Sequence, residues 1–529
     1  MNPTNGKLSK RQWFRMSFLE CIAISMLMIP YISLKLAGQY HVVALFFGLA
    51  LAVLYGMLLT LLATKYPDGY VNAIRNHMGG FAGVFDVVYA IRYVLRAAFI
   101  ALFFAMVVQQ YLMRSFSLYT IVISFLVLCG YGASKTMEGR GRMFELLFWW
   151  MLAPLILLVV FSISNLDIGM LQAEVSSHAG MRGIVKGGYG ILLALSPFEF
   201  QIYSQTCVKD FSKNDAWKLF VWVAFSVLFA YLFIVGILGA GWTESDIAAS
   251  FNVMEATAFP GGTVSRLDYA VMAFWVIGVF AIVSGYLHYA GNYVFSLCSV
   301  KMKIGKTMTF LAVTTVSIVF VFVLQNGVVA DYLMRYFLYA DFAMSLLLPA
   351  IVAVVKVKEK RKIGKALACL VFAAAVVCVI FIDENLGEQF VATKSGAIER
   401  QQESLEHRDY VTTMQVDTDT SDRYVFTFLI ADLSGYEGES SLKESEYIVC
   451  ADSLKSAMAV YQEQENRQLD LGHIEQIVTE ETNDAWHRLL LEFGRQPGVS
   501  KSVSVVVGTQ EEKYILREMI KAAYGRESF

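Results

Sequence analysis

Long apolar segments recur along this 529-residue chain up to about residue 382, and they constrain its fold more than any other feature. Each is long enough to cross about 30 Å of hydrocarbon as a helix. Charged residues make up 17% of the sequence, whereas a globular domain carries about 25%. We predict eleven transmembrane spans, at residues 14–36, 42–64, 84–112, 117–133, 143–163, 184–206, 217–241, 268–297, 307–324, 331–355 and 366–382.

The basic residues between the spans indicate the orientation of the chain. With a cytoplasmic N-terminus, the inner segments hold 21 Lys and Arg residues and the outer segments hold 5. Lys and Arg are retained on the cytoplasmic side of membranes, so this excess supports the orientation. An odd number of spans then places the region after the last span outside.

The charge balance changes at the last span. Residues 383–529 hold 28 acidic and 14 basic residues, whereas residues 1–382 hold 17 and 29. We therefore predict a ten-span transporter-like membrane domain at 1–357, a basic linker with the eleventh span at 358–383, and a soluble, extracytoplasmic α/β domain at 384–529.

The predicted soluble domain alternates strand and helix patterns. The helix at 452–466 has Asp452 or Ser453 as its N-cap, and Gly494 and Gly525 end two others. Strands are expected at 409–418, 422–431, 445–451, 473–479 and 501–508, and helices at 452–466, 483–494 and 510–525.

The sequence contains no pattern typical of catalysis or metal binding. Cys450 is the only one of seven cysteines in the soluble region, and no Cys/His spacing indicates a metal site. No GxSxG, HExxH or phosphate-binding loop is present. We predict no enzymatic activity, no cofactor, no metal and no nucleic-acid partner.

A proline and a carboxylate interrupt the sixth span, at Pro197 and Glu199 of "ILLALSPFEF". Without the eleventh span, ten spans divide into two sets of five with opposite directions, and Pro30 of span 1 corresponds to Pro197. Matched interruptions indicate a 5+5 inverted-repeat transporter with broken helices 1 and 6 and a site at the breaks. A simple proline kink is the alternative.

The breaks predict a ligand site near the middle of the membrane. We expect Glu199 to face the break near Pro30, accessible to water or ligand, and to accept a ligand ammonium group or a proton, while the helix N-terminus after Pro197 binds a carboxylate. The alternative is that Glu199 only pairs with an intramembrane arginine. The candidate ligand-binding residues are Ser25, Pro30, Arg92, Arg96, Ser196, Pro197, Glu199 and Tyr286.

Two arginines of the third span need polar partners. Arg92 and Arg96 are four residues apart and lie on one face of a helix, which cannot be the face toward lipid. They either line a cavity or pair with Asp86, Glu145 or Glu199.

Three segments of the membrane region resemble a known family. They are "ISMLMIPYISLKLAG" in span 1, "GRGRMFELLFWWMLAPLILLVVFSISNLDIGML" at span 5, and "LSPFEF" in span 6. They resemble the transporter-like B subunit of bacterial spore germinant receptors, a branch of the amino acid–polyamine–organocation transporter superfamily. The resemblance covers about residues 8–357 and implies a LeuT-like fold.

The soluble domain resembles a second subunit of the same receptors. "DSLKSAMAVYQEQENRQLDLGHIEQIVTEE" and "LLEFGRQPGVSKSVSVVVG" are similar to the N-terminal domain of the C subunit, with Arg467, His473 and the Phe493–Arg495 step at matching places. The C subunit is ordinarily a lipoprotein on the outer face of the spore inner membrane. Here the eleventh span takes the place of the anchor, and the apolar residues after Cys369 argue against lipoprotein processing.

The resemblance implies a fused subunit of a spore germinant receptor, multi-pass in the spore inner membrane or cell membrane. Such a subunit senses a small nutrient such as an amino acid and signals to an A-type subunit and to other C-type subunits. An amino acid permease that uses Glu199 or Asp341 for coupling is the alternative. A scaffold without a ligand is a third interpretation.

Overall fold

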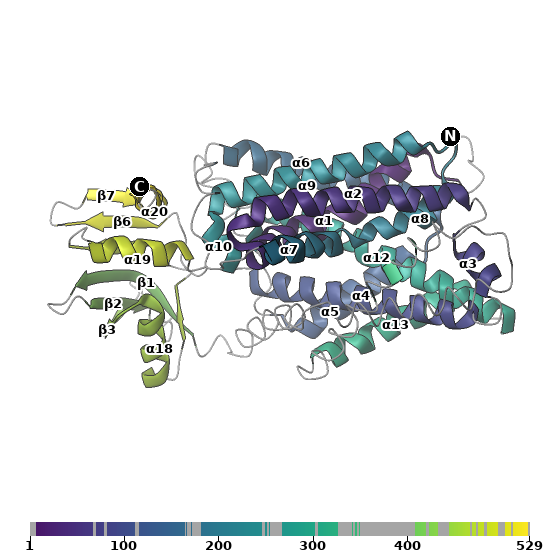
Figure 1. The fold of residues 1–529 in the computed structure, drawn as a ribbon. Helices are drawn as coiled ribbons and strands as arrows, with labels where there is room; N and C mark the ends of the chain where they lie inside the picture. Colours follow the sequence, from purple (N-terminus) through teal and green to yellow (C-terminus); the bar gives the residue numbers. More distant parts are fainter. Residues whose placement is uncertain are drawn as a thin grey trace. The chain divides into compact units, whose positions relative to one another are not determined.

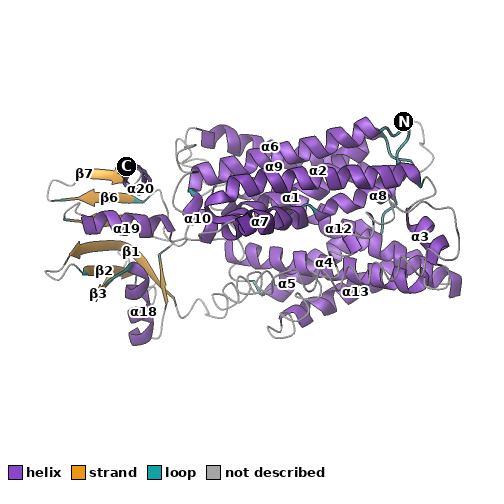
Figure 2. Ribbon diagram, viewed as in Figure 1, coloured by secondary structure: helices purple, strands orange, loops and turns teal. Residues whose placement is uncertain are grey.

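The computed structural model describes most of residues 7–325 and most of residues 408–526, and the chain divides into two units that are considered separately. One consists of helices and the other holds a β-sheet (Figures 1 and 2). The described ranges are 7–66, 70–78, 82–111, 116–163, 181–245, 267–301, 305–325, 408–418, 423–431, 444–465, 468–471, 474–480, 484–495, 503–508 and 512–526, with a few shorter stretches that include Asp341 and residues 344–345.

The described helices before residue 326 follow the predicted spans closely. They are α1 (Lys10–Ala37), α2 (His41–Lys65), α3 (Tyr70–Met78), α4 (Ala82–Tyr111), α5 (Leu118–Ala133), α6 (Met137–Ser162), α7 (Met181–Ala194), α8 (Gln201–Ser204), α9 (Lys213–Leu238), α10 (Ala240–Ser245), α12 (Leu267–Lys301) and α13 (Lys306–Gln325). Within this part of the chain, six helical segments are long and apolar enough to cross a membrane, the first of them holding both α1 and α2.

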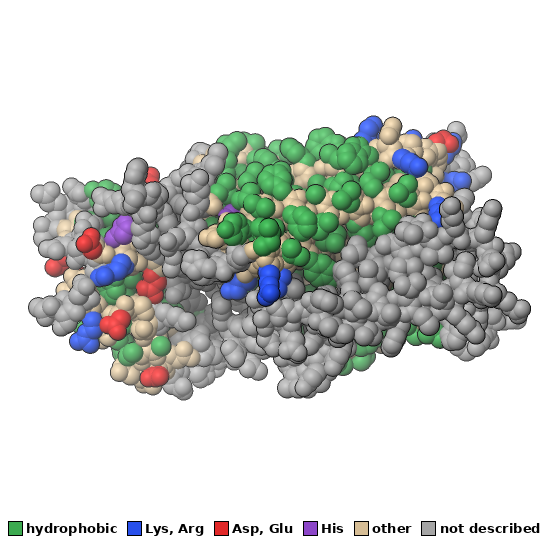
Figure 3. Space-filling view, in the orientation of Figure 1, with side chains coloured by type: hydrophobic (Ala, Val, Ile, Leu, Met, Phe, Trp, Pro, Cys, Tyr) green, Lys and Arg blue, Asp and Glu red, His purple; other side chains and the backbone are tan. Residues whose placement is uncertain are grey.

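The surface of the helical unit is apolar over much of the face in Figure 3. Leu146 and Trp150 of α6 are 73% and 74% exposed, which suits contact with acyl chains. The eleventh predicted span lies outside the described residues, and the tenth is described at only a few positions.

The first predicted span is not interrupted. Helix α1 begins at a capping box, in which Ser9 and Gln12 exchange side-chain-to-backbone hydrogen bonds, and it continues through Pro30 to Ala37. The prediction of a break in this span is therefore wrong for the structure described here. Membrane helices accommodate a proline when their neighbours satisfy the freed backbone groups, and Pro30 is buried.

The sixth predicted span is interrupted where the sequence indicated. Helix α7 ends at Ala194, and a 3₁₀ helix, η5 (Ser196–Phe200), follows before the single turn of α8. Pro197 has no backbone N–H and occupies the start of η5, where none is required. The interruption places Glu199 inside the helical unit.

Glycines allow α2 and α7 to pack closely. A Cβ atom on Gly48 would lie 2.7 Å from the Cβ of Ile191 and 2.8 Å from the backbone oxygen of Gly188. A backbone atom cannot move aside as a flexible side chain would. This close contact holds α7 in place directly before the interruption.

Replacing Gly48 with alanine is expected to destabilise the protein by about 1–3 kcal/mol, because the added methyl group overpacks this contact. Gly305→Ala is the matched control, because a Cβ at that position would meet no described atom within 4 Å other than those of its chain neighbours. Melting of the purified chain in detergent checks the difference. Equal melting temperatures of the two variants would show that α2 and α7 separate without cost.

The second unit holds a seven-stranded sheet in its described part. The strand order is β3-β2-β1-β5-β6-β7, and β4 pairs with β1 outside this order. The pairs β1–β4, β1–β5 and β5–β6 are parallel, and the others are antiparallel. The strands are β1 (Arg408–Thr418), β2 (Tyr424–Ala431), β3 (Glu444–Ala451), β4 (Gln468–Asp470), β5 (Gln476–Thr479), β6 (Ser504–Val507) and β7 (Glu512–Ile515).

The core of this unit follows strand and helix periodicity. Alternate residues of β2 are buried, from Tyr424 to Ile430. In β1 a register shift between Val411 and Thr413 moves the buried positions by one residue. Three helices, α18 (Leu454–Glu465), α19 (Asp484–Arg495) and α20 (Leu516–Arg526), add buried side chains to the same core.

Most of the predicted elements of this unit are present, and Ser453 caps α18 through the backbone N–H of Ser456 at 3.1 Å. The predicted helix at 510–525 is partly wrong, because its first residues form β7, which pairs antiparallel with β6. Gly508 permits the chain to turn there, since its φ is +69°. Strand β4 was not predicted, and His473 lies outside the described residues.

Candidate functional site

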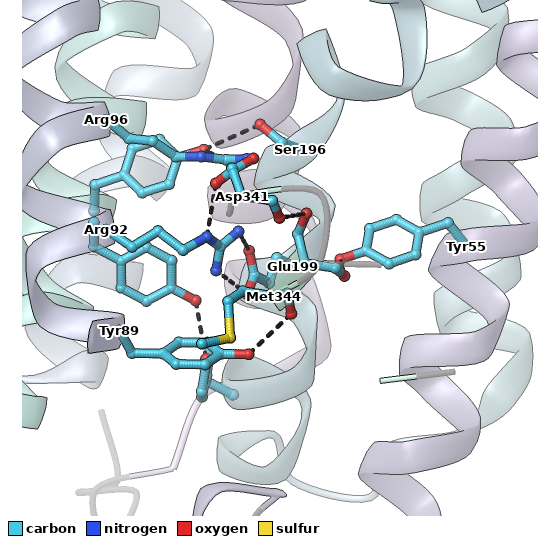
Figure 4. Close-up of polar contacts among 12 residues, drawn as sticks. Tyr55, Tyr89, Arg92, Arg96, Ser196, Glu199, Asp341 and Met344 are labelled. Carbon is cyan, nitrogen blue, oxygen red and sulfur yellow. Dashed lines mark hydrogen bonds and ion pairs between the residues drawn. The ribbon is translucent and has the colours of Figure 1, made fainter. Parts of the chain in front are cut away.

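Arg92 of α4 is the centre of a buried ion-pair cluster (Figure 4). Its Nη1 and Nη2 atoms donate to the two carboxylate oxygens of Glu199 at 2.7 and 2.6 Å, and its Nε donates to Asp341 at 2.7 Å. The side chains of all three residues are at most 4% exposed. This two-point geometry is the strongest that an arginine makes with a carboxylate.

Arg96 extends the cluster one helical turn further along α4. Its Nη2 donates to the second oxygen of Asp341, and its Nη1 donates to the hydroxyl of Tyr286 on α12 at 2.8 Å. The Tyr286 hydroxyl also lies 3.2 Å from the hydroxyl of Ser196, the first residue of η5. Two arginines thus balance two carboxylates, and the cluster as a whole is neutral.

Tyrosines fix the short described segment that follows Asp341. The hydroxyl of Tyr55 on α2 donates to the backbone oxygen of Ser345, and that of Tyr89 donates to the backbone oxygen of Met344 at 3.0 Å. The Ser345 hydroxyl in turn donates to the backbone oxygen of Asp341 at 2.5 Å. These bonds join α2 and α4 to the tenth predicted span at the level of the cluster (Figure 4).

Glu199 does not have the surroundings that we expected for it. It faces Arg92 on α4, not Pro30, and is only 2% exposed. The prediction of a carboxylate accessible at the break is therefore wrong, because the arginine neutralises and covers it. The alternative, pairing with an intramembrane arginine, describes its contacts correctly. Asp341 was not predicted as the second carboxylate partner of Arg92. A carboxylate within the apolar tenth span was the sign that could have indicated it.

The other suggested partners of the arginines lie elsewhere. Asp86 accepts two hydrogen bonds from Nε of Arg75, both 3.0 Å long. Glu145 accepts from Gln12 and Arg15 at the start of α1. Both carboxylates therefore join helices near the ends of spans and take no part in the cluster.

The predicted residues of the first span lie beside the interruption. Ser25 donates to the backbone oxygen of Cys21 at 2.6 Å, and its hydroxyl is 3.4 Å from the backbone oxygen of Ala194, the last residue of α7. Pro30 is buried further along α1. Ser25 thus contacts the break in span 6, whereas the structure gives Pro30 no part in it.

A small cavity adjoins the Arg96 end of the cluster. Its volume is about 100 Å³. Its polar end consists of Arg96, Asp341, Ser196 and Tyr286, while Arg92 and Glu199 are not part of its lining. The walls are mainly apolar and come from α1, α4, α7 and η5: Ile24, Met28, Ile32, Phe99, Ile100, Gly190, Leu193, Ala194 and Pro197.

A second buried ion pair was not foreseen from the sequence. Arg140 of α6 donates to Glu20 of α1 at 2.8 Å and to the backbone oxygen of Ser284 of α12 at 3.0 Å. Both side chains are 0% exposed. The carboxylate of Glu20 within the first apolar span was the sign in the sequence that a basic partner was needed.

The described residues contain no group of three or more His, Cys, Asp or Glu side chains that could hold a metal ion. The arrangement is suited to binding a small molecule and to linking helices.

Solved structures with a similar fold are membrane transporters. A Na⁺-coupled sialic acid symporter matches with a TM-score of 0.53 and 11% identity, over 74% of this chain and 89% of that one. The nucleobase–cation symporter Mhp1 (TM-score 0.47, 12% identity, 77% and 100% covered) and a manganese transporter of Eremococcus coleocola (0.44, 13%, 74% and 93%) match less well. The first match shows the fold, which is that of the LeuT-like transporters. No curated protein matches the chain.

Family models identify the chain more closely. A model described as spore germination protein matches residues 7–328, more than half of the chain. A model described as spore germination protein N-terminal domain matches residues 401–521. The chain belongs to the spore germination protein family. It is an integral membrane protein and a subunit of a spore germinant receptor, with a transporter-type membrane part joined to a domain of the C-subunit type.

Proposed function

We propose that this receptor subunit senses a small nutrient in the cavity beside the interruption of the sixth span. The observation that carries the proposal is that this cavity, the 3₁₀ segment η5 and the ion-pair cluster adjoin one another. Interrupted membrane helices are typical of the binding sites of transporters with this fold. A ligand in the cavity would touch α1, α4, α7 and Asp341 together.

The cluster is suited to passing on a binding signal. Asp341 and Arg92 join α4, η5 and the tenth predicted span through four hydrogen bonds, so a small change at one of them alters the others. A ligand that favours one arrangement of these elements shifts the population toward it. The receptor would report the nutrient through this shift and would not need to transport it.

The proposed setting of the protein is the spore inner membrane, with the N-terminus in the cytoplasm and the C-terminal domain outside. The partners would be an A-type subunit and other C-type subunits of the receptor. We propose no enzymatic activity and no nucleic-acid partner. The charge asymmetry of the loops and the C-subunit-type domain after residue 400 support this arrangement.

Germination and uptake assays separate a sensor from a permease. Spores that carry Ala194→Phe, which fills the cavity, are expected to lose their response to the cognate nutrient, whereas Phe225→Leu on the exposed side of α9 keeps it. Purified protein in liposomes is expected to accumulate no labelled amino acid. Concentrative uptake would favour the permease, and an undiminished response of the Ala194→Phe spores would remove the cavity from the function.

A further inference from the structure

The two arginines of the cluster differ in how many of their N–H groups make hydrogen bonds. Three of the five N–H groups of Arg92 bind carboxylates, and its side chain is 4% exposed. Arg96 uses two of its five, for Asp341 and Tyr286, and it lines the cavity. Among the described residues no acceptor is placed on its other three. Arg96 therefore has hydrogen-bond donors to offer to a ligand.

The cavity has two chemically different ends. The guanidinium of Arg96, the carboxylate of Asp341 and the hydroxyl groups of Tyr286 and Ser196 form one end. Aliphatic and aromatic side chains of α1 and α4, such as Ile24, Met28 and Phe99, form the walls. A ligand that fits both ends carries an anionic group and a short apolar group.

The second carboxylate of the cluster limits the charge that the ligand can carry. Glu199 is bound at two points to Arg92 and is not part of the cavity lining, so it is not placed to bind an ammonium group of a ligand in the cavity. The selectivity of the cavity for charge therefore depends on Arg96 and on Asp341 beside it.

We propose that Arg96 binds the carboxylate of a small aliphatic ligand, and that this carboxylate replaces Asp341 as the partner of Arg96. The proposal rests on the proposed function and names the ligand class and the residue that recognises it. Arginine binds carboxylates at two points, which its three spare N–H groups allow. Asp341 keeps its bond to Arg92, so the exchange loosens the tenth predicted span while each carboxylate still contacts an arginine.

The volume of the cavity restricts the ligand further. About 150 Å³ is enough for benzene, which has six heavy atoms, in a dry protein cavity, so about 100 Å³ suits a molecule of about four or five heavy atoms. Short monocarboxylates and the smallest amino acids have this size. Both classes of molecule carry a carboxylate and a short aliphatic group. Binding experiments distinguish a monocarboxylate from an amino acid.

Binding of three matched probes to the purified full chain in detergent tests the proposal. The probes are L-alanine, propionate and propionamide, the last having the shape of propionate without its charge. The wild-type protein is expected to bind propionate or L-alanine, or both, at least about tenfold more tightly than propionamide. Arg96→Gln should weaken carboxylate binding about 10- to 100-fold, as expected for the loss of a charge-assisted pair.

Asp341→Asn is expected to strengthen the binding of carboxylates, whereas Arg96→Gln weakens it. The substitution removes the competitor for Arg96 and keeps the shape of the side chain, so carboxylates should bind more tightly than to the wild type. A purely structural role of Asp341 would instead weaken binding. Arg142→Gln is the matched control, because Arg142 is exposed and pairs only with Glu138 of its own helix among the described residues. Melting without ligand verifies that each variant is folded.

Three outcomes would overturn the proposal: equal affinity for propionate and propionamide, an unchanged Kd in Arg96→Gln, or weaker carboxylate binding by Asp341→Asn. Saturable binding of propionamide, with no binding of either carboxylate, would also overturn it and would leave the proposed function standing. If the protein binds no small molecule at all, both fail.

Discussion

Arg92→Gln is expected to be one of the two most destabilising single substitutions in the helical unit, with a loss of about 3–5 kcal/mol. The reason is that Glu199 loses its two-point partner while it remains buried, and Asp341 keeps only Arg96. A buried carboxylate without a counter-charge is costly wherever it lies in a membrane protein. The membrane yield and melting temperature of the variant should both fall.

The control for Arg92→Gln is Glu138→Gln, which removes an exposed pair with Arg142 four residues along α6. Such pairs contribute about 0.5 kcal/mol or less. If the two variants melt at similar temperatures, Arg92 is solvated in the folded protein and the cluster does not hold α4 to η5.

Arg140→Gln should destabilise the protein by a similar amount, about 3–5 kcal/mol, because it also leaves a buried carboxylate without its counter-charge. Arg140 is the partner of Glu20, neither side chain has any exposed surface, and the second oxygen of Glu20 has no hydrogen-bond partner among the described residues. The pair joins α1, α6 and, through Ser284, α12.

The double variant Glu20→Leu/Arg140→Met shows whether Arg140→Gln is unstable because it leaves a buried charge unpaired or because it loses side-chain packing. Replacing a buried ion pair with apolar residues of similar volume is often neutral or stabilising, so the double variant should melt well above Arg140→Gln alone. Melting curves of the wild type, the single variants and the double variant measure the interaction. A double variant as unstable as the single one would contradict the ion-pair account.

Hydropathy was sufficient to predict the described helices before residue 326, because the length of an apolar segment is a local property of a sequence. The interruption at Pro197 was also predictable, since a proline and a nearby carboxylate occur together there. Pro30 has the same residue type but no polar neighbour that requires a break, and α1 passes through it. Proline alone does not distinguish a kink from an interruption.

The partners within the cluster were harder to predict. Helical spacing placed Arg92 and Arg96 on one face, but which carboxylate reached them depended on how helices far apart in sequence pack. Asp341 is 249 residues from Arg92 along the chain. The pair of Glu20 and Arg140 was not predicted for the same reason, because it also depends on how helices far apart in sequence pack.

In the sheet unit, short strands were the least predictable elements. Strand β7 has exposed residues from Lys513 to Ile515 and no buried alternation, so its identity comes from pairing with β6. Strand β4 has three residues and depends in the same way on β1. Tertiary pairing, more than local propensity, decides such segments.

A structure of the full chain determined with its bound nutrient would test the central claim most directly. The account predicts the ligand in the cavity between α1, α4 and α7, with an anionic group within hydrogen-bond distance of Arg96 and Tyr286 and with Asp341 moved away from Arg96. A nutrient bound to the sheet unit, or an empty cavity with the pair of Arg96 and Asp341 unchanged, would contradict it.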